Sequence, residues 1–225
     1  GSVPSRDVTY HHVEFVRGTM DRHKELVEAR VASLAGLFSE IGPVEYTKAT
    51  QHAQHVLVEC GMSGFIFYMS EALVYQLERR ATILDASQLP PSCAAKAKHL
   101  KKSLPKVREA CKEAAARLAS DGELTAVPNV SGKCRKLLEE LVRLFTEHDD
   151  PEYKGIVFVE QVALAPPLAE VINQHMAERG CAVRAAAVSG VSSMSDAKRQ
   201  ARLDRFHGGA LRLLVCTQAL EQGTD

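Results

Sequence analysis

The residues with the clearest chemical potential lie in the segment 211–225, which reads Leu-Arg-Leu-Leu-Val-Cys-Thr-Gln-Ala-Leu-Glu-Gln-Gly-Thr-Asp. Its apolar start predicts a buried strand over 211–216, which places the hydroxyl of Thr217 at the carboxyl end. Ligands of open α/β sheets bind at the carboxyl ends of the strands. A threonine there can donate a hydrogen bond to a phosphate oxygen, and Gly223 permits close backbone approach. A strand followed by threonine and Gly-x-Asp is also common in a purely structural role, so the segment by itself leaves that role and contact with a phosphate-bearing ligand both open.

A second candidate region is basic. The chain of 225 residues is formally neutral, with 28 basic and 28 acidic side chains, so it is not a strongly basic nucleic-acid binder. Residues 93–120, however, hold eight basic and two acidic side chains, and Lys98, Lys101 and Lys102 are among the basic ones. This excess indicates either a solvated helix face or a surface that follows phosphates with salt-sensitive affinity. Because few aromatic residues interleave, contact with the backbone of duplex RNA fits better than base stacking.

The sequence offers no catalytic residue and no metal site. The stretch Ser131-Gly-Lys-Cys134 imitates a phosphate-binding loop, but Val127 stands at the position of its first glycine and Cys134 replaces the hydroxyl that would hold magnesium. His52 and His55 are spaced so that their imidazoles could approach each other on a helix. No convincing third ligand accompanies them, so we interpret both as surface side chains.

The first half of the chain has helical periodicity. Apolar residues repeat on one helix face in two segments, at Val27, Val31, Leu34, Phe38 and Ile41 and at Met62, Ile66, Met69, Leu73 and Leu77. The alanine-rich stretch 93–120 favours a further helix, which Pro105 is expected to kink or split because proline lacks the N–H donor. We expect an all-helical unit over residues 1–122.

The periodicity changes after a linker near residue 122. Ser131 is suited to cap a helix, and Pro166-Pro167 to open another. Beyond these helices we expect three buried strands, at 155–159, 182–188 and 211–216. A further helix is expected at 194–206, between the second and third strands. Helices between strands indicate a parallel sheet, and the chain ends just after the third strand. The expected fold class is α/β, with an incomplete parallel α/β unit over residues 123–225. A smaller basic stripe on the last helix comprises Lys198, Arg202 and Arg205.

Features that report on location agree with an intracellular protein, either cytoplasmic or nuclear. No stretch is long and apolar enough for a membrane span, and the start of the chain lacks the pattern of a signal peptide. The six cysteines are expected to be free thiols, mostly buried, at Cys60, Cys93, Cys111, Cys134, Cys181 and Cys216.

The second half of the chain resembles superfamily 2 helicases. The segment 211–225 resembles motif V of that family, and Gly155-Ile-Val-Phe-Val-Glu160 resembles motif IV. The order and spacing of the motif residues between them also agree, at Val188, Ser189, Gly190, Arg199, Leu203, Phe206 and Gly209. The similarity is greatest to the Dicer and RIG-I-like branch, which carries a helical insertion before its second RecA-like domain. By this resemblance, residues 1–122 are the insertion and residues 123–225 are the N-terminal part of that domain.

The resemblance implies a function and a set of site residues. The whole protein would be an ATP-dependent helicase or translocase of double-stranded RNA, acting in RNA silencing and carrying RNase III activity if it is a Dicer. RNA-binding positions implied by the resemblance would be Glu160, Ser189, Gly190, Thr217 and Gln218. The charge of the basic stretch, and not the resemblance, adds Lys98, Lys101 and Lys102 as RNA-binding candidates. Gly223 and Asp225 would face ATP and Mg²⁺, which the whole protein would bind. The stretch in hand holds less than half of that site, so we expect no cofactor and no ATPase activity of its own.

Two alternatives remain open from the sequence. One is a DNA-repair translocase of the Hef type, whose helical insertion is analogous. The other is an interaction module, in which the helical unit docks a partner such as a double-stranded-RNA-binding protein. Motif V also departs from its usual pattern, because Gln222 stands where a second acidic residue is common.

Overall fold

The computed structural model describes residues 25, 43–86, 89–120, 129–148, 150, 152–190 and 193–217. The apolar pattern over 27–41, and the linker expected near residue 122, lie outside these residues.

The described part of the first half is helical and contains no strand. Its helices are α3 (Pro43–Cys60), α4 (Met62–Phe67), the π-helical turn η1 (Tyr68–Ala72), α5 (Leu73–Leu84) and α6 (Pro91–Ser120). Gly61 separates α3 from α4 with a φ of +86°, a conformation that glycine adopts without steric cost. The predicted apolar face from Met62 to Leu77 is confirmed, since most of its side chains are buried.

Pro105 does not split α6, which runs unbroken for 30 residues. The expected split is therefore wrong. The side chain of Pro105 lies on the exposed side of the helix, while Leu100, Val107 and Cys111 on the opposite side are buried. Packing of these residues before and after the proline holds both halves of the helix in place, and this offsets the missing hydrogen bond.

The second half forms a parallel α/β layer, as predicted. Its elements are α7 (Gly132–Glu147), β1 (Gly155–Val159), the 3₁₀ turn η3 (Val162–Leu164), α8 (Ala165–Glu178), β2 (Ala185–Val188), α9 (Asp196–His207) and β3 (Leu213–Thr217). The strand order is β1-β3-β2, and both pairings are parallel. Ser131 caps α7 by accepting a hydrogen bond from the Cys134 amide at 3.1 Å. The second and third strands begin two or three residues later than expected.

Two side chains fix where the later strands begin. The amide of Asn173 on α8 pairs with the backbone of Ala185, accepting from its N–H at 2.8 Å and donating to its carbonyl at 3.1 Å. The guanidinium of Arg212 donates to the carbonyls of Tyr153 and Asp150, at 3.0 and 2.6 Å, and lies 5.0 Å from the ring centre of Phe145. These contacts explain why β2 starts at Ala185 and β3 just after Arg212.

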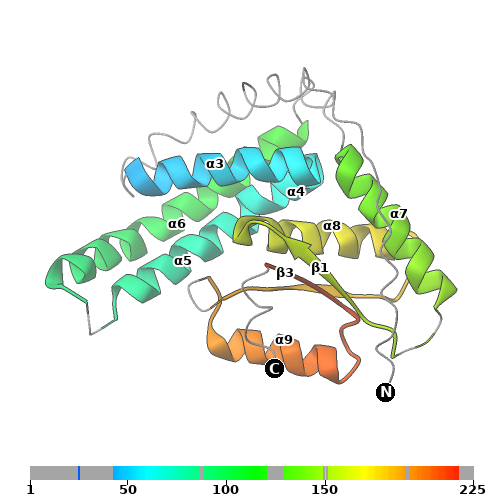
Figure 1. The fold of residues 1–225 in the computed structure, drawn as a ribbon. Coiled ribbons are helices and arrows are strands. Elements are labelled where there is room, and N and C mark those ends of the chain that lie inside the picture. The colour runs from blue at the N-terminus through cyan, green and yellow to red at the C-terminus, as the bar shows by residue number, and fades with distance from the viewer. Residues whose placement is uncertain are drawn as a thin grey trace.

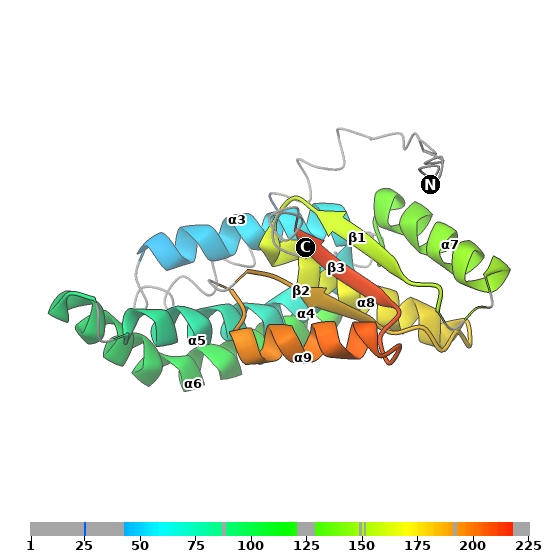
Figure 2. The same ribbon diagram turned by 60° about the horizontal axis from the view of Figure 1, so that its bottom comes forward.

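One hydrophobic core joins the helical layer to the sheet (Figure 1). Helix α8 lies between them, with α4 packed on one side and β2 and β3 on the other. Figure 2 shows the three strands side by side with α9 near β2, where Leu203 and Phe206 pack against a smaller cluster of Val188, Leu214 and Cys216. The helical layer therefore contacts the α/β layer mainly through α3 and α4, which pack on η3, α7 and α8. The division into units at residue 122 stays a prediction.

Candidate nucleic-acid interface

The sheet brings three predicted RNA-binding residues to one edge. Thr217 is paired with Val159 in the register of β1 and β3, and Cys216 is paired with Val188 of β2. Glu160 and Ser189 directly follow those strands, so they lie at the same carboxyl edge as Thr217. Thr217 and Ser189 are 6% and 5% exposed, whereas Glu160 is exposed. Only Glu160 of these three is openly accessible in the described part of the chain.

Gly190 opens the turn that leads to α9. Its carbonyl accepts hydrogen bonds from the Ser193 and Met194 amides, both at 3.0 Å, and from the Ser193 hydroxyl at 3.1 Å. A Cβ at Gly190 would meet nothing within 4 Å, so the backbone there is open to a ligand. The remaining predicted positions, Gln218, Gly223 and Asp225, lie outside the described residues.

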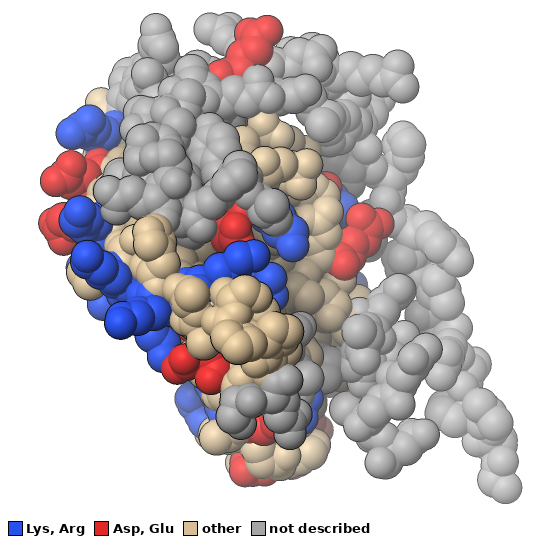
Figure 3. Space-filling model, turned by 90° about the vertical axis from the view of Figure 1, so that its left-hand side faces the viewer, with Lys and Arg blue, Asp and Glu red and all other residues tan. Residues whose placement is uncertain are grey.

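The lysines predicted on α6 are exposed but do not form a uniform free surface. Lys101 pairs with Asp85 at 2.5 Å, and Arg108 pairs with Glu78 of α5. Lys98 and Lys102 are exposed, and neither has an ion-pair partner among the described residues. Figure 3 shows Lys and Arg side chains gathered on the side of the molecule where α5 and α6 lie. The basic stretch therefore divides into side chains held by α5 and side chains that remain available.

The basic stripe of α9 also contacts the helical layer. The ammonium of Lys198 lies 4.1 Å from the ring centre of Tyr75 on α5, a cation–π geometry. The guanidinium of Arg202 donates to the carbonyl of Ala187 in β2. Partial burial lowers the pKa of both side chains, with neighbouring cations adding to the effect. Lys198 therefore supports the contact between the layers, whereas the hydrogen bond of Arg202 joins α9 to β2. The helical spacing of the stripe alone predicted neither contact.

A cleft with a volume of about 790 Å³ opens beside the carboxyl edge of the sheet. Its walls are α3, α5 and the residues that follow β1, and its lining includes Lys48, His52, His55, Arg80 and Gln161. The sequence analysis missed Lys48 and Arg80, since neither belongs to a motif or a dense basic run. The sequence feature that could have indicated this cleft was the spacing of His52 and His55, which we interpreted as two surface histidines.

The imidazole of His52 interacts with side chains of both its own helix and the helices packed against it. The imidazole is half-buried and meets the Tyr68 ring edge-on, with 6.5 Å between ring centres. Burial lowers the pKa of His52, and the nearby Lys48 and His55 lower it further, whereas a hydrogen bond with Gln76 raises it. No group of three or more His, Cys, Asp or Glu that could hold a metal occurs among the described residues.

The cysteines are free thiols, as predicted, and four of them are buried. Burial raises the pKa of Cys111 to about 11 and that of Cys134 to about 12, and it raises the pKa of Cys60 further still. A thiol with so high a pKa is not a nucleophile at neutral pH. None of the described helices combines the length and the apolar character needed to cross a membrane.

Comparisons with known proteins agree with this fold. Residues 132–225 match the family described as helicase conserved C-terminal domain. The chain is also similar to Dicer-like protein 2 of Aspergillus oryzae (strain ATCC 42149 / RIB 40), with 28% identity over 183 residues. That alignment covers 77% of this chain and 12% of the relative, so the chain spans a small part of that protein. The resemblance to Dicer-like superfamily 2 helicases is confirmed.

One solved structure is also similar, the crystal structure of the Pyrococcus furiosus Hef helicase domain. The alignment has a TM-score of 0.38 and 18% identity, and it covers 94% of this chain and 38% of that one. The match to the helicase C-terminal domain, together with the parallel three-stranded sheet, identifies the second half as resembling an incomplete RecA-like domain.

Proposed function

We propose, on the premise that residues 132–225 carry a helicase C-terminal domain, that this chain is the nucleic-acid-contacting part of an ATP-dependent double-stranded-RNA helicase or translocase of the Dicer-like branch. The observation that carries the proposal is the shared edge of Glu160, Ser189 and Thr217, which the sheet register creates inside that domain. The hydroxyls of Ser189 and Thr217 are nearly buried at this edge, so each would donate to a phosphate oxygen that comes directly against it, without reading the base sequence.

The helical layer would add charge to this contact. Lys98 and Lys102 project from α6 without acidic partners among the described residues, so they are free to neutralise phosphates. Lys101 would contribute less than the sequence suggested, because Asp85 already holds it. Duplex RNA is recognised mainly through its shape and backbone, which suits a surface of lysines and hydroxyls.

The chemistry of ATP would belong to the whole protein. Gly223 and Asp225 would face the nucleotide and its Mg²⁺, as motif V implies, and the partner residues of that site are absent from this sequence. The chain alone is expected to show no ATPase activity with or without RNA. The whole protein would act inside the cell, in RNA silencing, where a double-stranded-RNA-binding protein is the expected partner of the helical layer.

A matched pair of charge variants tests the RNA contact. Lys98→Gln with Lys102→Gln removes two charges that have no acidic partner among the described residues. Lys101→Gln with Arg108→Gln removes two that already pair with Asp85 and Glu78. The first pair should weaken duplex binding for every sequence and lower the slope of log affinity against log salt by roughly one unit per lost contact. The second pair should change binding much less. Equal effects, or none from either pair, would contradict the proposed role of the α6 surface.

The neutral contact at the sheet edge needs a separate variant. Thr217→Ala should weaken binding by about 0.5–1.5 kcal/mol with little change in the salt slope, because it removes a hydroxyl and no charge. Titrations with duplex RNA and duplex DNA at two salt concentrations measure both variants. Tighter binding of DNA would favour a DNA translocase, and a chain that binds neither would favour an interaction module.

A further inference from the structure

The cleft beside the carboxyl edge of the sheet has the chemistry of an anion site. Helix α3 supplies Lys48, His52 and His55 to its wall, and α5 supplies Arg80 from the other side. None of the described residues that line it is acidic. The side-chain amide of Gln161, which follows Glu160 at the end of β1, adds an uncharged donor to the same wall.

The charges in the cleft are not balanced internally. Lys48 and Arg80 are exposed, and neither makes an ion pair with another described residue. The carboxylate of Glu45 lines an adjoining recess together with both of them. Two permanent cations and two imidazoles therefore line the cleft, and none of its described lining residues is acidic. This differs from the neighbouring α5–α6 contact, where Lys101 and Arg108 each have an acidic partner.

We propose that this cleft binds a phosphate group of the RNA, held between Lys48 of α3 and Arg80 of α5. The proposal rests on the proposed function and extends it to a defined site. The cleft begins where the predicted RNA-contacting edge ends, because Gln161 follows Glu160 directly and Ser193 closes the turn from Gly190. A strand whose backbone passes Thr217 would meet these cations next. Arg80 can donate two parallel hydrogen bonds to phosphate oxygens, and Lys48 adds a point charge.

The imidazole of His52 makes the site sensitive to pH. It faces Lys48 and His55 on its own helix and Gln76 on α5, with Arg80 and Glu45 nearby. In the empty cleft these cations and burial disfavour a positive charge on His52. A bound phosphate reverses that balance, so phosphate binding and protonation of His52 favour each other. RNA affinity should therefore rise as the pH falls below neutrality, and His52→Gln should remove much of that rise.

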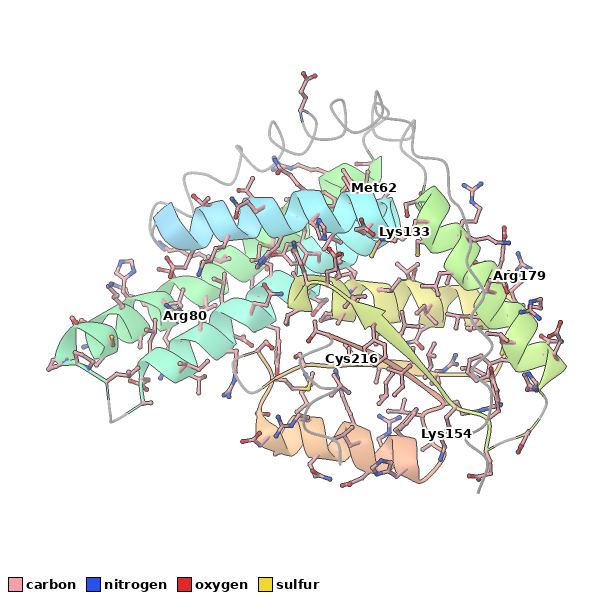
Figure 4. The ribbon with its side chains drawn as sticks, viewed as in Figure 1. Met62, Arg80, Lys133, Lys154, Arg179 and Cys216 are labelled. Carbon is pink, nitrogen blue, oxygen red and sulfur yellow. The ribbon has the colours of Figure 1, made fainter. Side chains whose placement is uncertain are left out.

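The test compares two double variants that remove the same charge from opposite ends of the sheet. Lys48→Gln with Arg80→Gln empties the cleft of its permanent cations, and Arg179→Gln with Arg184→Gln is the matched control near the start of β2. Figure 4 shows Arg80 and Arg179 at opposite ends of the molecule. All four side chains are exposed, so both variants should fold. Duplex RNA carrying either a 5′-phosphate or a 5′-hydroxyl is the probe, titrated at two salt concentrations.

The cleft variant should lose about tenfold in RNA affinity, since charge-assisted hydrogen bonds contribute strongly. The control should change affinity less than about twofold. If the loss occurs only with the 5′-phosphate, the site takes a strand end; if it occurs equally with both probes, the site takes an internal phosphate. Equal affinities of the two variants would overturn the cleft assignment and leave the proposed function standing. A wild-type chain that binds neither probe would overturn the proposed function and, with it, this site.

Discussion

The exposed face of α6 and the cleft between α3 and α5 are both basic, yet their charges are balanced differently. On α6, the side chains nearest α5 pair with Asp85 and Glu78, and only part of the lysine-rich face is left without partners. The cleft has far fewer basic side chains than α6, but neither Lys48 nor Arg80 has an acidic partner among the described residues. The difference teaches that the density of lysine in a sequence does not measure the positive charge that a ligand meets. The acidic side chains on the elements packed alongside determine how much of that charge stays unpaired.

Both regions pack on the same hydrophobic core. A variant in that core has the largest expected effect on stability. Ile172 of α8 is fully buried between the helical layer and the sheet. Ile172→Ala should lower the free energy of unfolding by about 2–5 kcal/mol. Hydrogen exchange should then speed up both in α6 and in β3. Ile156→Ala, at a side chain that is 49% exposed, is the control and should cost much less. Faster exchange confined to the strands would show that the helical layer and the sheet are independent units.

A backbone variant at the end of α3, the helix that lines the cleft, tests a close approach to the start of α7. Gly61 ends α3 with a positive φ, and a Cβ there would lie 2.7 Å from the Asn129 carbonyl oxygen and 2.8 Å from the Ser131 nitrogen. Gly61→Ala should cost about 2–4 kcal/mol, from the strained φ and the displaced backbone together.

Gly180→Ala provides the control for strain alone. Its φ is also positive, at +69°, but a Cβ there would meet nothing within 4 Å. It should cost only about 1–2 kcal/mol. Chemical denaturation measures both variants, and equal costs would show that the close approach at Gly61 has no energetic weight.

The ion pair between Lys101 and Asp85 tests whether α6 charges are truly engaged. Both side chains are half-exposed, so water and salt screen the pair. A double-mutant cycle of Lys101→Gln and Asp85→Asn should give a coupling of about 0.2–1 kcal/mol that declines with added salt. A coupling of zero would mean that Lys101 is as free as Lys98, and it would remove the contrast between the two regions.

The smallest expected effect is a pH dependence of stability that comes from the cleft. Burial, Lys48 and His55 lower the pKa of His52, so the folded chain takes up its proton less readily than the unfolded chain. The stability that neutral His52 contributes to the folded chain is complete above the unfolded pKa of about 6.5, and it is lost as the pH falls below that value. In His52→Gln this part of the pH dependence should disappear from thermal unfolding curves. The exposed His99 of α6 is the matched control, and an identical effect of His99→Gln would contradict the assignment to the cleft.

Much of the fold follows from local patterns in the sequence. The switch from helical to β-branched runs predicted helices before a parallel sheet, because side-chain periodicity reports directly which face of an element is buried. Ser131 was identified as a helix cap because capping involves only neighbours in the chain. The edge that joins Glu160, Ser189 and Thr217 was also predictable, since the carboxyl ends of parallel strands meet at one edge of a sheet. Motif V supplied the nucleotide positions Gly223 and Asp225, which remain predictions.

Other features were decided only by the tertiary structure. Pro105 was expected to kink or split α6, but packing of both halves of that helix against its neighbours kept it continuous. The pairing of Lys101 with Asp85, and the meeting of Lys48 with Arg80 across a cleft, depend on how α3, α5 and α6 approach one another. Coulombic interactions act through space and fall with distance, not with separation along the chain. The sequence patterns therefore determined which kinds of element form and in what order, and the packing of those elements determined several of their boundaries and which charges stay free to bind.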